Sequence, residues 1–324
     1  MVMPKGSYVN LGYGAPITFD DSMHLSAFGR VAVSQSIELF SSQQQYGDDP
    51  TEWETALAGT GAVTFLPNES TVQLSTGGTA AGASAIRQTR LYHRYVPGHG
   101  QQILQTFCFD GGVQVTGNTR RIGYFDASNG IFLEASGETV YVVRRSNVTG
   151  TPVDFRVAQE DWNVDRLDGS GPSGITADWS KTQILMTDLQ WLGVGRVRVG
   201  FNIDGMLVPV HFFNHANIQP TVYMTTANLP CRVENFNSAT ANGVVTMRHI
   251  CTSVVTGGGA EPSYGKLYAY NNGGAGTAVN SSTPIPIISV RAATTGPNGV
   301  RNTGQLSLEQ YDVAAVGRTR STGR

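Results

Sequence analysis

The chain has 324 residues, 39 of them glycine, and only 14% are charged, with a formal net charge of −2. Average proteins contain about 7% glycine and about 25% charged residues, so this composition is typical of a turn-rich chain that contacts other protein surfaces. The near-neutral charge gives no electrostatic argument for nucleic acid or an anionic membrane, and no apolar run reaches the ~18 residues of a membrane helix.

Residues 1–85 are expected to form an extended N-terminal arm with short strands. Strand-forming runs occur at 30–40 and 70–74, whereas 77–84 (GGTAAGAS) has the composition of a turn or linker. The segment 52–58 is at best a short helix. Because an arm of this kind buries little surface by packing on itself, we expect it to lie along its own β domain or a neighbouring subunit.

From residue 86 to residue 255, dense alternation of apolar and polar residues predicts a β-sandwich core. The strongest signal is 196–213 (RVRVGFNIDGMLVPVHFF), where two strand-forming runs flank Asp204 and Gly205, a signature of a two-residue hairpin turn. Within RVRV, the period of two places both arginines on one face and both valines on the other. The eleven strands that we expect span residues 87–95, 101–109, 119–125, 130–135, 139–146, 182–191, 196–202, 207–213, 221–227, 231–237 and 243–253.

These patterns together predict an all-β fold. The expected architecture is an antiparallel β-sandwich of jelly-roll type, with extended N-terminal and C-terminal arms. Residues 256–324 form the C-terminal region, in which a Gly/Asn/Ser cluster at 271–282 precedes a proline-framed strand at 285–291. This region is either a final strand pair or an extended arm.

The one long excursion between strands, residues 159–180, contains the most distinctive polar cluster. Two interpretations stay open for it. Its aspartates either form local turns and a solvated loop, or they line a sugar-binding patch in which Trp162 and Trp179 stack on the glycan while Asp165 and Asp168 accept hydrogen bonds. A glycosidase acid pair needs two carboxylates at a defined separation in a cleft, and the sequence shows no such pattern.

The remaining reactive side chains do not form a recognisable site. Cys108, Cys231 and Cys251 have apolar neighbours, which favours buried thiols over disulfides or a zinc site. His211 and His215 are expected to be hydrogen-bonded residues of a strand and its turn, because no further metal-ligating residue has suitable spacing. We therefore expect no catalytic, cofactor-binding or metal site, and no enzymatic activity.

Several blocks carry a family resemblance. In chain order they are AFGRVAVS (27–34), LFS (39–41), LPNES (66–70), IRQT (86–89), YHRYVPG (92–98), RIGYFD (121–126), WNVDRLDGSGPSGI (162–175), WLGVGRV (191–197) and YMTTANLP (223–230). Over roughly residues 27–262 the chain resembles uncharacterised virion structural proteins of tailed bacteriophages, of the tail-fibre, spike or capsid-surface type.

The resemblance implies a non-enzymatic structural subunit of a homo-oligomeric fibre, spike or adhesion device, as a trimer or another homo-oligomer. Its partners would be copies of itself, other tail, neck or capsid proteins, and a host-surface glycan, within a virion assembled in the host cytoplasm. Nucleic acid and membrane insertion are not expected. Two alternatives stay open, namely a decoration or cementing protein on the phage head and a carbohydrate-binding module.

Overall fold

The computed structural model describes residues 7–9, 17–19 and 36–257, together with 290–291, 293–295, 299 and 302. Contacts divide the chain into two units, residues 1–262 and 263–324, and all strands named below belong to the first. In the second unit, the Asn302 amide donates to the Thr294 carbonyl at 3.0 Å. The expected strand at 285–291 falls mostly outside the described residues.

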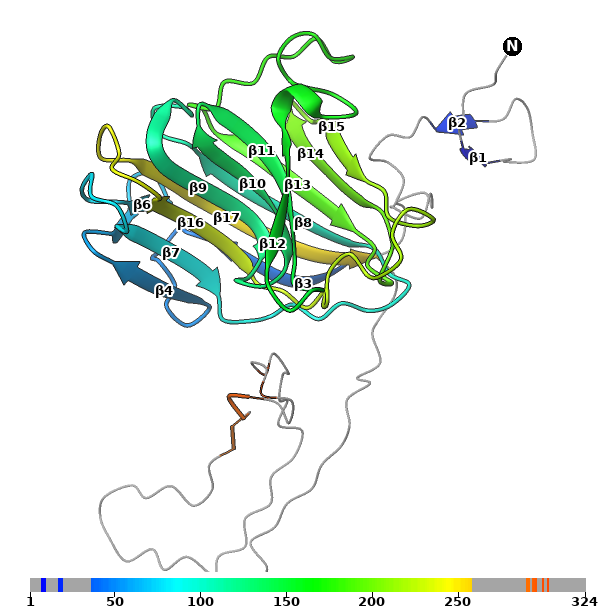
Figure 1. Ribbon diagram of the computed structural model, residues 1–324, viewed down its shortest axis with the longest axis horizontal. Coiled ribbons are helices and arrows are strands. Elements are labelled where there is room, and N and C mark those ends of the chain that lie inside the picture. Colours follow the sequence, from blue (N-terminus) through cyan, green and yellow to red (C-terminus); the bar gives the residue numbers. More distant parts are fainter. Residues whose placement is uncertain are drawn as a thin grey trace, which may run out of the picture. The chain divides into compact units, whose positions relative to one another are not determined.

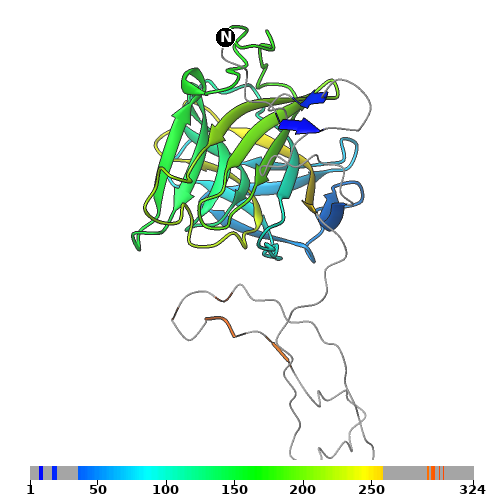
Figure 2. The ribbon, with the colours of Figure 1, turned by 90° about the vertical axis from the view of Figure 1, so that its right-hand side faces the viewer.

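In the described part of the chain the regular secondary structure is strand apart from one 3₁₀ turn, and nearly all of these strands lie in two antiparallel sheets packed as layers (Figure 1; Figure 2). The seven-stranded sheet has the order β12-β11-β10-β9-β16-β7-β4, and the eight-stranded sheet has the order β15-β14-β13-β8-β17-β6-β5 with β3 also paired to β17. The elements are β1 (Ser7–Val9), β2 (Ile17–Phe19), β3 (Ser36–Gln43), β4 (Trp53–Ala58), β5 (Ala62–Leu66), β6 (Thr71–Ser75), β7 (Ser84–Thr89), β8 (Gln101–Cys108), β9 (Val115–Phe125), β10 (Gly130–Gly137), β11 (Thr139–Ser146), β12 (Val153–Ala158), a 3₁₀ turn (Gln159–Asp161), β13 (Gln183–Leu189), β14 (Val197–Ile203), β15 (Met206–Phe213), β16 (Cys231–Asn237) and β17 (Thr246–Gly257).

The architecture confirms the expected all-β sandwich. Strands β1 and β2 form a separate antiparallel pair. In the described residues no helix is long and apolar enough to cross a membrane.

The main core lies between the two sheets and follows the period of two. Ile122 and Leu133 of the seven-stranded sheet and Val197 and Val199 of the eight-stranded sheet are at most 1% exposed and belong to one apolar cluster. Arg198 lies between the two valines and pairs with Asp188, the residue opposite it on β13. Because successive strand residues point to opposite faces, this alternation fixes which face of each sheet turns inward.

The hairpin signature at the centre of 196–213 is also confirmed. Strand β14 ends at Ile203 and β15 begins at Met206, leaving Asp204 and Gly205 as the turn. Both turn residues have positive φ, 50° and 80°, which is the conformation of a type I′ turn that matches the twist of the flanking strands.

The predicted domain boundary at residue 85 is wrong, because strands β3 to β7 are integral parts of the two sheets. The glycine-rich stretch 77–84 is part of the connection between β6 and β7, which lie in different sheets, rather than a linker between domains. A Cβ on Gly77, which has φ +62°, would lie 1.9 Å from the Thr60 carbonyl oxygen, so glycine is needed for close backbone approach. Any N-terminal arm is therefore confined to residues before 36, which lie largely outside the described ranges.

Three local predictions differ from the structure. The segment 52–58 contributes strand β4 rather than a helix, and β1, β2, β5 and β12 were not predicted. Residues 221–227 form no strand, although Tyr223 and Met224 are buried there. The stretch is an irregular loop whose apolar residues reach into the core. These apolar residues give it the composition of a strand, which explains the wrong prediction.

Candidate functional site

The tryptophans of the predicted glycan patch lie in the core. Trp162 and Trp179 are only 4% and 7% exposed, meet edge to face with ring centroids 6.3 Å apart, and both pack against Phe201. Their indole N–H groups donate to the Val157 carbonyl and to Gln159 Oε1, each at 3.2 Å. Stacking on a sugar needs an exposed ring face, and burial covers both rings.

The two aspartates of the same prediction hold their own loop in shape. Asp165 is 3% exposed and accepts hydrogen bonds from the Leu167 amide at 2.8 Å and the Ser173 amide at 2.7 Å. Exposed Asp168 accepts from the hydroxyl and amide of Ser170, which lower its pKa. This is the Asx-turn chemistry of the alternative interpretation. A glycan contact by these four residues remains a prediction.

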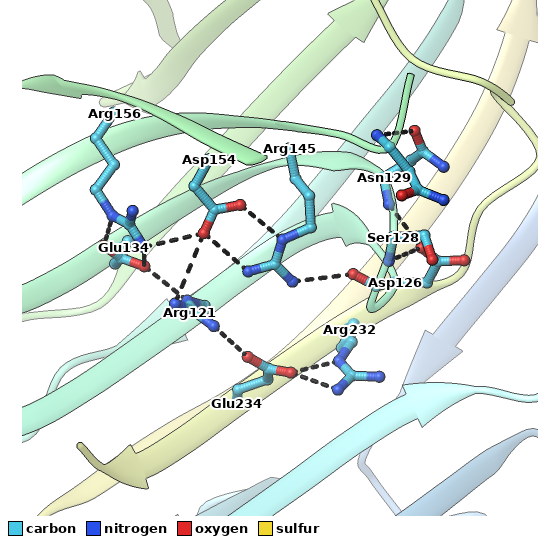
Figure 3. Close-up of polar contacts among 11 residues, drawn as sticks. Arg121, Asp126, Ser128, Asn129, Glu134, Arg145, Asp154, Arg156, Arg232 and Glu234 are labelled. Atoms are coloured by element: carbon cyan, nitrogen blue, oxygen red, sulfur yellow. Dashed lines mark hydrogen bonds and ion pairs between the residues drawn. The ribbon is translucent and has the colours of Figure 1, made fainter. Parts of the chain in front are cut away.

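The densest polar cluster lies elsewhere, on the outer face of the seven-stranded sheet (Figure 3). We call it the outer charged face. Alternate residues of five neighbouring strands form it: Arg121 of β9, Glu134 of β10, Arg145 of β11, Asp154 and Arg156 of β12, and Arg232 and Glu234 of β16.

Strand register explains why these side chains meet. Arg121 lies directly opposite Glu134 on one neighbouring strand and opposite Glu234 on the other. On the same face, nearer the β12 edge of the sheet, Arg145 lies opposite Asp154. Directly opposed residues of antiparallel strands have Cβ atoms about 5 Å apart, so each charge faces one of opposite sign.

The ion pairs form a continuous chain across the five strands. Arg121 donates to Glu134 at 2.6 Å and to Glu234 at 3.1 Å, while Arg156 donates to the other oxygen of Glu134 at 2.6 Å. Three further pairs complete it. Arg145 holds Asp154 in a bidentate pair at 2.7 and 3.0 Å, and Arg156 donates to Asp154 at 2.9 Å. Arg232 donates to Glu234 at 2.6 Å.

Aromatic rings lie beneath the charges and are covered by them. Phe125 and Phe132 are at most 1% exposed and form a small cluster apart from the main core. The guanidinium of Arg145 lies 5.1 Å from the Phe132 ring centroid, that of Arg121 lies 5.4 Å from the same ring, and that of Arg232 lies 5.7 Å from Phe125. Each arginine thus combines an ion pair with a cation–π contact.

This environment favours the charged forms of Asp154, Arg145 and Arg156. Burial by itself raises the pKa of Asp154, but the hydrogen bonds and charge of Arg145, with the charges of Arg156 and Arg121, outweigh it and lower the pKa overall. The same contacts raise the pKa of Arg145 against its burial, and the hydrogen bond to Glu134 raises the pKa of Arg156. A general acid needs a proton near neutral pH, which Asp154, with its lowered pKa, lacks. The ion pairs of this face connect neighbouring strands of the sheet.

Four histidines of the sandwich are buried, and burial favours their neutral form. Burial lowers the pKa of His93, His211 and His215 to about 4 and that of His249 to about 3. His215 Nδ1 donates a 2.7 Å hydrogen bond to the Gly195 carbonyl, and the ring stacks on Tyr223 with centroids 4.0 Å apart. Within the described ranges, no three His, Cys, Asp or Glu side chains are grouped to hold a metal ion.

The expectation of buried thiols is confirmed for two cysteines. Cys108 and Cys231 are buried, whereas Cys251 is partly exposed, and all three are free. Burial raises the pKa of Cys108 to about 11 and also raises that of the other two. Thiols of this kind are poor nucleophiles at neutral pH.

Sequence reasoning missed the outer charged face. Its signal is the pair of opposite charges two residues apart on one strand, as in Asp154 with Arg156 and Arg232 with Glu234. Such pairs share a face of the strand, and they become a network only when neighbouring strands supply the partners.

The chain was compared with known proteins. No family model matches it, and no curated protein matches it either. Similar solved structures include the binding domain of botulinum neurotoxin DC in complex with SialylT, with 10% identity, a TM-score of 0.38, and coverage of 67% of this chain and 47% of that chain. The chain thus matches less than half the length of that toxin domain.

Two other similar structures are matched over nearly their whole length. A protein of unknown function from Shewanella oneidensis MR-1 has 8% identity and a TM-score of 0.45, with 72% of this chain and 91% of that chain covered. A family 16 glycosyl hydrolase from Mycobacterium smegmatis has 11% identity and a TM-score of 0.44, with 67% and 100% covered.

Proposed function

We propose that the chain is a non-enzymatic structural subunit of a bacteriophage particle, in a homo-oligomeric fibre, spike or adhesion device. The resemblance of its ordered sequence blocks to virion structural proteins supports this proposal. The sandwich of residues 36–257 contains nearly all of those blocks.

The observation that carries the proposal is that the charged side chains of the outer charged face are paired with one another. Arg121 and Arg156 each pair with both Glu134 and Asp154, so this polar cluster stabilises the fold instead of presenting free acids or bases. A subunit that must keep its shape within a particle benefits from a sheet that is stabilised by an apolar core on one face and by ion pairs on the other.

The direct test is to locate the chain in the particle of the phage that encodes it. Purified particles would be analysed by mass spectrometry, and then imaged by cryo-electron microscopy with and without an antibody raised against residues 36–257. We expect the chain in stoichiometric amounts, with antibody density on the tail or its fibres. Its absence from purified particles would refute the proposal.

The same images separate the second candidate, a decoration or cementing protein. Antibody density distributed over the head, at positions related by the symmetry of the shell, would favour that role over a fibre. Both candidates share the sandwich as a rigid body, so only the position on the particle distinguishes them.

Host-glycan contact is the third candidate and needs its own test. A glycan array probed with the full chain and with Asp168→Ala addresses it, because Asp168 is the exposed acceptor of the predicted patch. Trp162→Ala is unsuitable, since it removes a core side chain. Binding that Asp168→Ala abolishes would support the patch, and an array without binding would remove it.

A further inference from the structure

Strand β12 forms one edge of the seven-stranded sheet and carries exposed apolar side chains. Among the described residues it pairs only with β11. Val153 and Phe155 are 56% and 53% exposed. An exposed edge strand offers unpaired backbone N–H and C=O groups to another strand, and proteins ordinarily protect such edges.

The apolar residues of this edge continue the interior of the sandwich. Phe155 meets Phe213 of β15 edge to face, with ring centroids 6.3 Å apart, and the Arg144 guanidinium lies 5.3 Å from the Phe155 centroid. Val157, two residues along on the same face, packs against the main core. The inner face of β12 is therefore the margin of the core, left partly open to solvent.

The order of charges on β12 is complementary to itself. Its sequence is Val-Asp-Phe-Arg-Val over residues 153–157. If a second copy of the strand runs antiparallel with Phe155 opposite Phe155, then each Asp154 lies opposite the Arg156 of the other copy. In the same register each Val153 lies opposite a Val157. Opposed residues of opposite charge stabilise an antiparallel pair, and like charges destabilise it.

We propose that two copies of this chain associate through their β12 edges, antiparallel and centred on Phe155. The two seven-stranded sheets then form one continuous sheet across a twofold axis, an isologous contact in which the same surface serves both subunits. This inference deepens the proposed function, on which it rests, by naming the surface through which copies join.

The outer charged face supports the same register. The exposed fraction of the Arg156 side chain is 39%, against 13% for Arg121 and Asp154, so Arg156 is the most accessible of these three. Pairing of the edges would bring it against Asp154 of the second copy and extend the chain of ion pairs from one subunit to the next. The Trp162 indole already occupies the Val157 carbonyl, which marks the end of the available edge.

The first test compares two valines of equal exposure. Val153→Lys places a charge in the proposed contact, whereas Val244→Lys changes a residue that is 57% exposed in the segment between β16 and β17. In sedimentation-velocity runs on the full-length chain we expect dimers for the unchanged protein and Val244→Lys, and an at least tenfold weaker association for Val153→Lys. Circular dichroism confirms that both variants fold.

The second test uses disulfide cross-linking to determine the register of the two β12 strands. Directly opposed Cα atoms of antiparallel strands lie about 5 Å apart, within the range of a disulfide. Phe155→Cys should therefore form a covalent dimer on mild oxidation. Val153→Cys should not, because in this register its two copies are four residues apart along the strands, roughly 13 Å at about 3.3 Å per residue.

Three outcomes would overturn the inference. They are association that Val153→Lys leaves unchanged, a monomeric unchanged protein, and cross-linking of Val153→Cys in preference to Phe155→Cys. If the chain is nevertheless found in the particle, only this contact fails and the proposed function stands. If the chain is absent from the particle while the β12 dimer forms, the dimer stands and the proposed function fails.

Discussion

On strand β10 of the seven-stranded sheet, an inward and an outward side chain are buried to nearly the same extent by opposite means. On β10, Leu133 points inward and is 0% exposed, while its neighbour Glu134 points outward and is 1% exposed. The inner residue is stabilised by transfer of apolar surface from water. The outer residue is stabilised only because Arg121 and Arg156 supply its partners. Burial alone therefore does not identify a hydrophobic core.

Because the two faces are stabilised differently, substitutions on each should reduce the free energy of unfolding in a different way. An apolar core loses stability in proportion to the atoms removed and to the cavity left behind. A buried ion-pair network loses more from one missing partner than the whole pair contributes, because the remaining charge is left desolvated and unpaired. We expect graded responses on the inner face and abrupt responses on the outer face.

Lowering the pH should produce the largest loss of stability. The buried histidines of the interior should cause it before the outer charged face contributes. His93, His211, His215 and His249 have pKa values lowered to about 4 or about 3, so each stays neutral when folded but binds a proton when unfolded below about pH 6.5. Stability therefore falls as pH drops from about 6.5 toward 4, by up to about 5 kcal/mol per pH unit if all four contribute.

The outer face should respond later in the same titration. The pKa of Asp154 is lowered by its arginines, so its contribution is present above the unfolded value of about 3.9 and is lost only as pH falls through the lower folded value. Urea unfolding at pH 7, 6 and 5 measures the first effect. Equal free energies of unfolding at these pH values would contradict the buried, neutral histidines.

Leu133→Ala should give the next largest effect and calibrate the inner face. The side chain is fully buried between the sheets, so its removal leaves a cavity and should cost about 2–5 kcal/mol. Leu133→Met, which conserves volume, should cost less than about 1.5 kcal/mol. Urea unfolding at pH 7 measures both. Equal losses for the two variants would argue against a close-packed inner face.

Glu134→Gln should be nearly as costly although it removes no atoms from the core. It deprives Arg121 and Arg156 of a shared carboxylate, and we expect a loss of about 3 kcal/mol. The matched control is Glu69→Gln, because Glu69 pairs with Arg248 at 3.1 Å on the surface, with 46% and 37% of the side chains exposed. Its loss should stay below about 1 kcal/mol. Similar losses for both variants would show that the outer face is an ordinary surface.

Much of the fold could be predicted from the sequence because its signals are local. The bounds of β11 and β16 agree with the predicted strands, and the Asp204-Gly205 turn is where the sequence places it. Strand β4 was missed because WETALA has few β-branched residues, and it becomes a strand by pairing with β7. Pairing overrides the weak local preference there.

The candidate site was harder to predict for a different reason. The glycan patch assumed that Trp162 and Trp179 face solvent, and composition does not reveal which side of a long loop packs inward. The outer charged face depends on contacts such as Arg121 with Glu234, 113 residues apart. Alternate charges on a strand indicate a polar face, but only the order of strands in the sheet shows that each charge has a partner.

The most direct test of the self-paired outer face is the coupling free energy between Arg121 and Glu134. A double-mutant cycle with Arg121→Met and Glu134→Gln, measured by urea unfolding at pH 7, isolates the interaction of these two side chains. The account predicts a coupling of about 2 kcal/mol, because each single change leaves the other partner buried with one of its ion pairs missing. Additive losses, with a coupling within about 0.3 kcal/mol of zero, would contradict it.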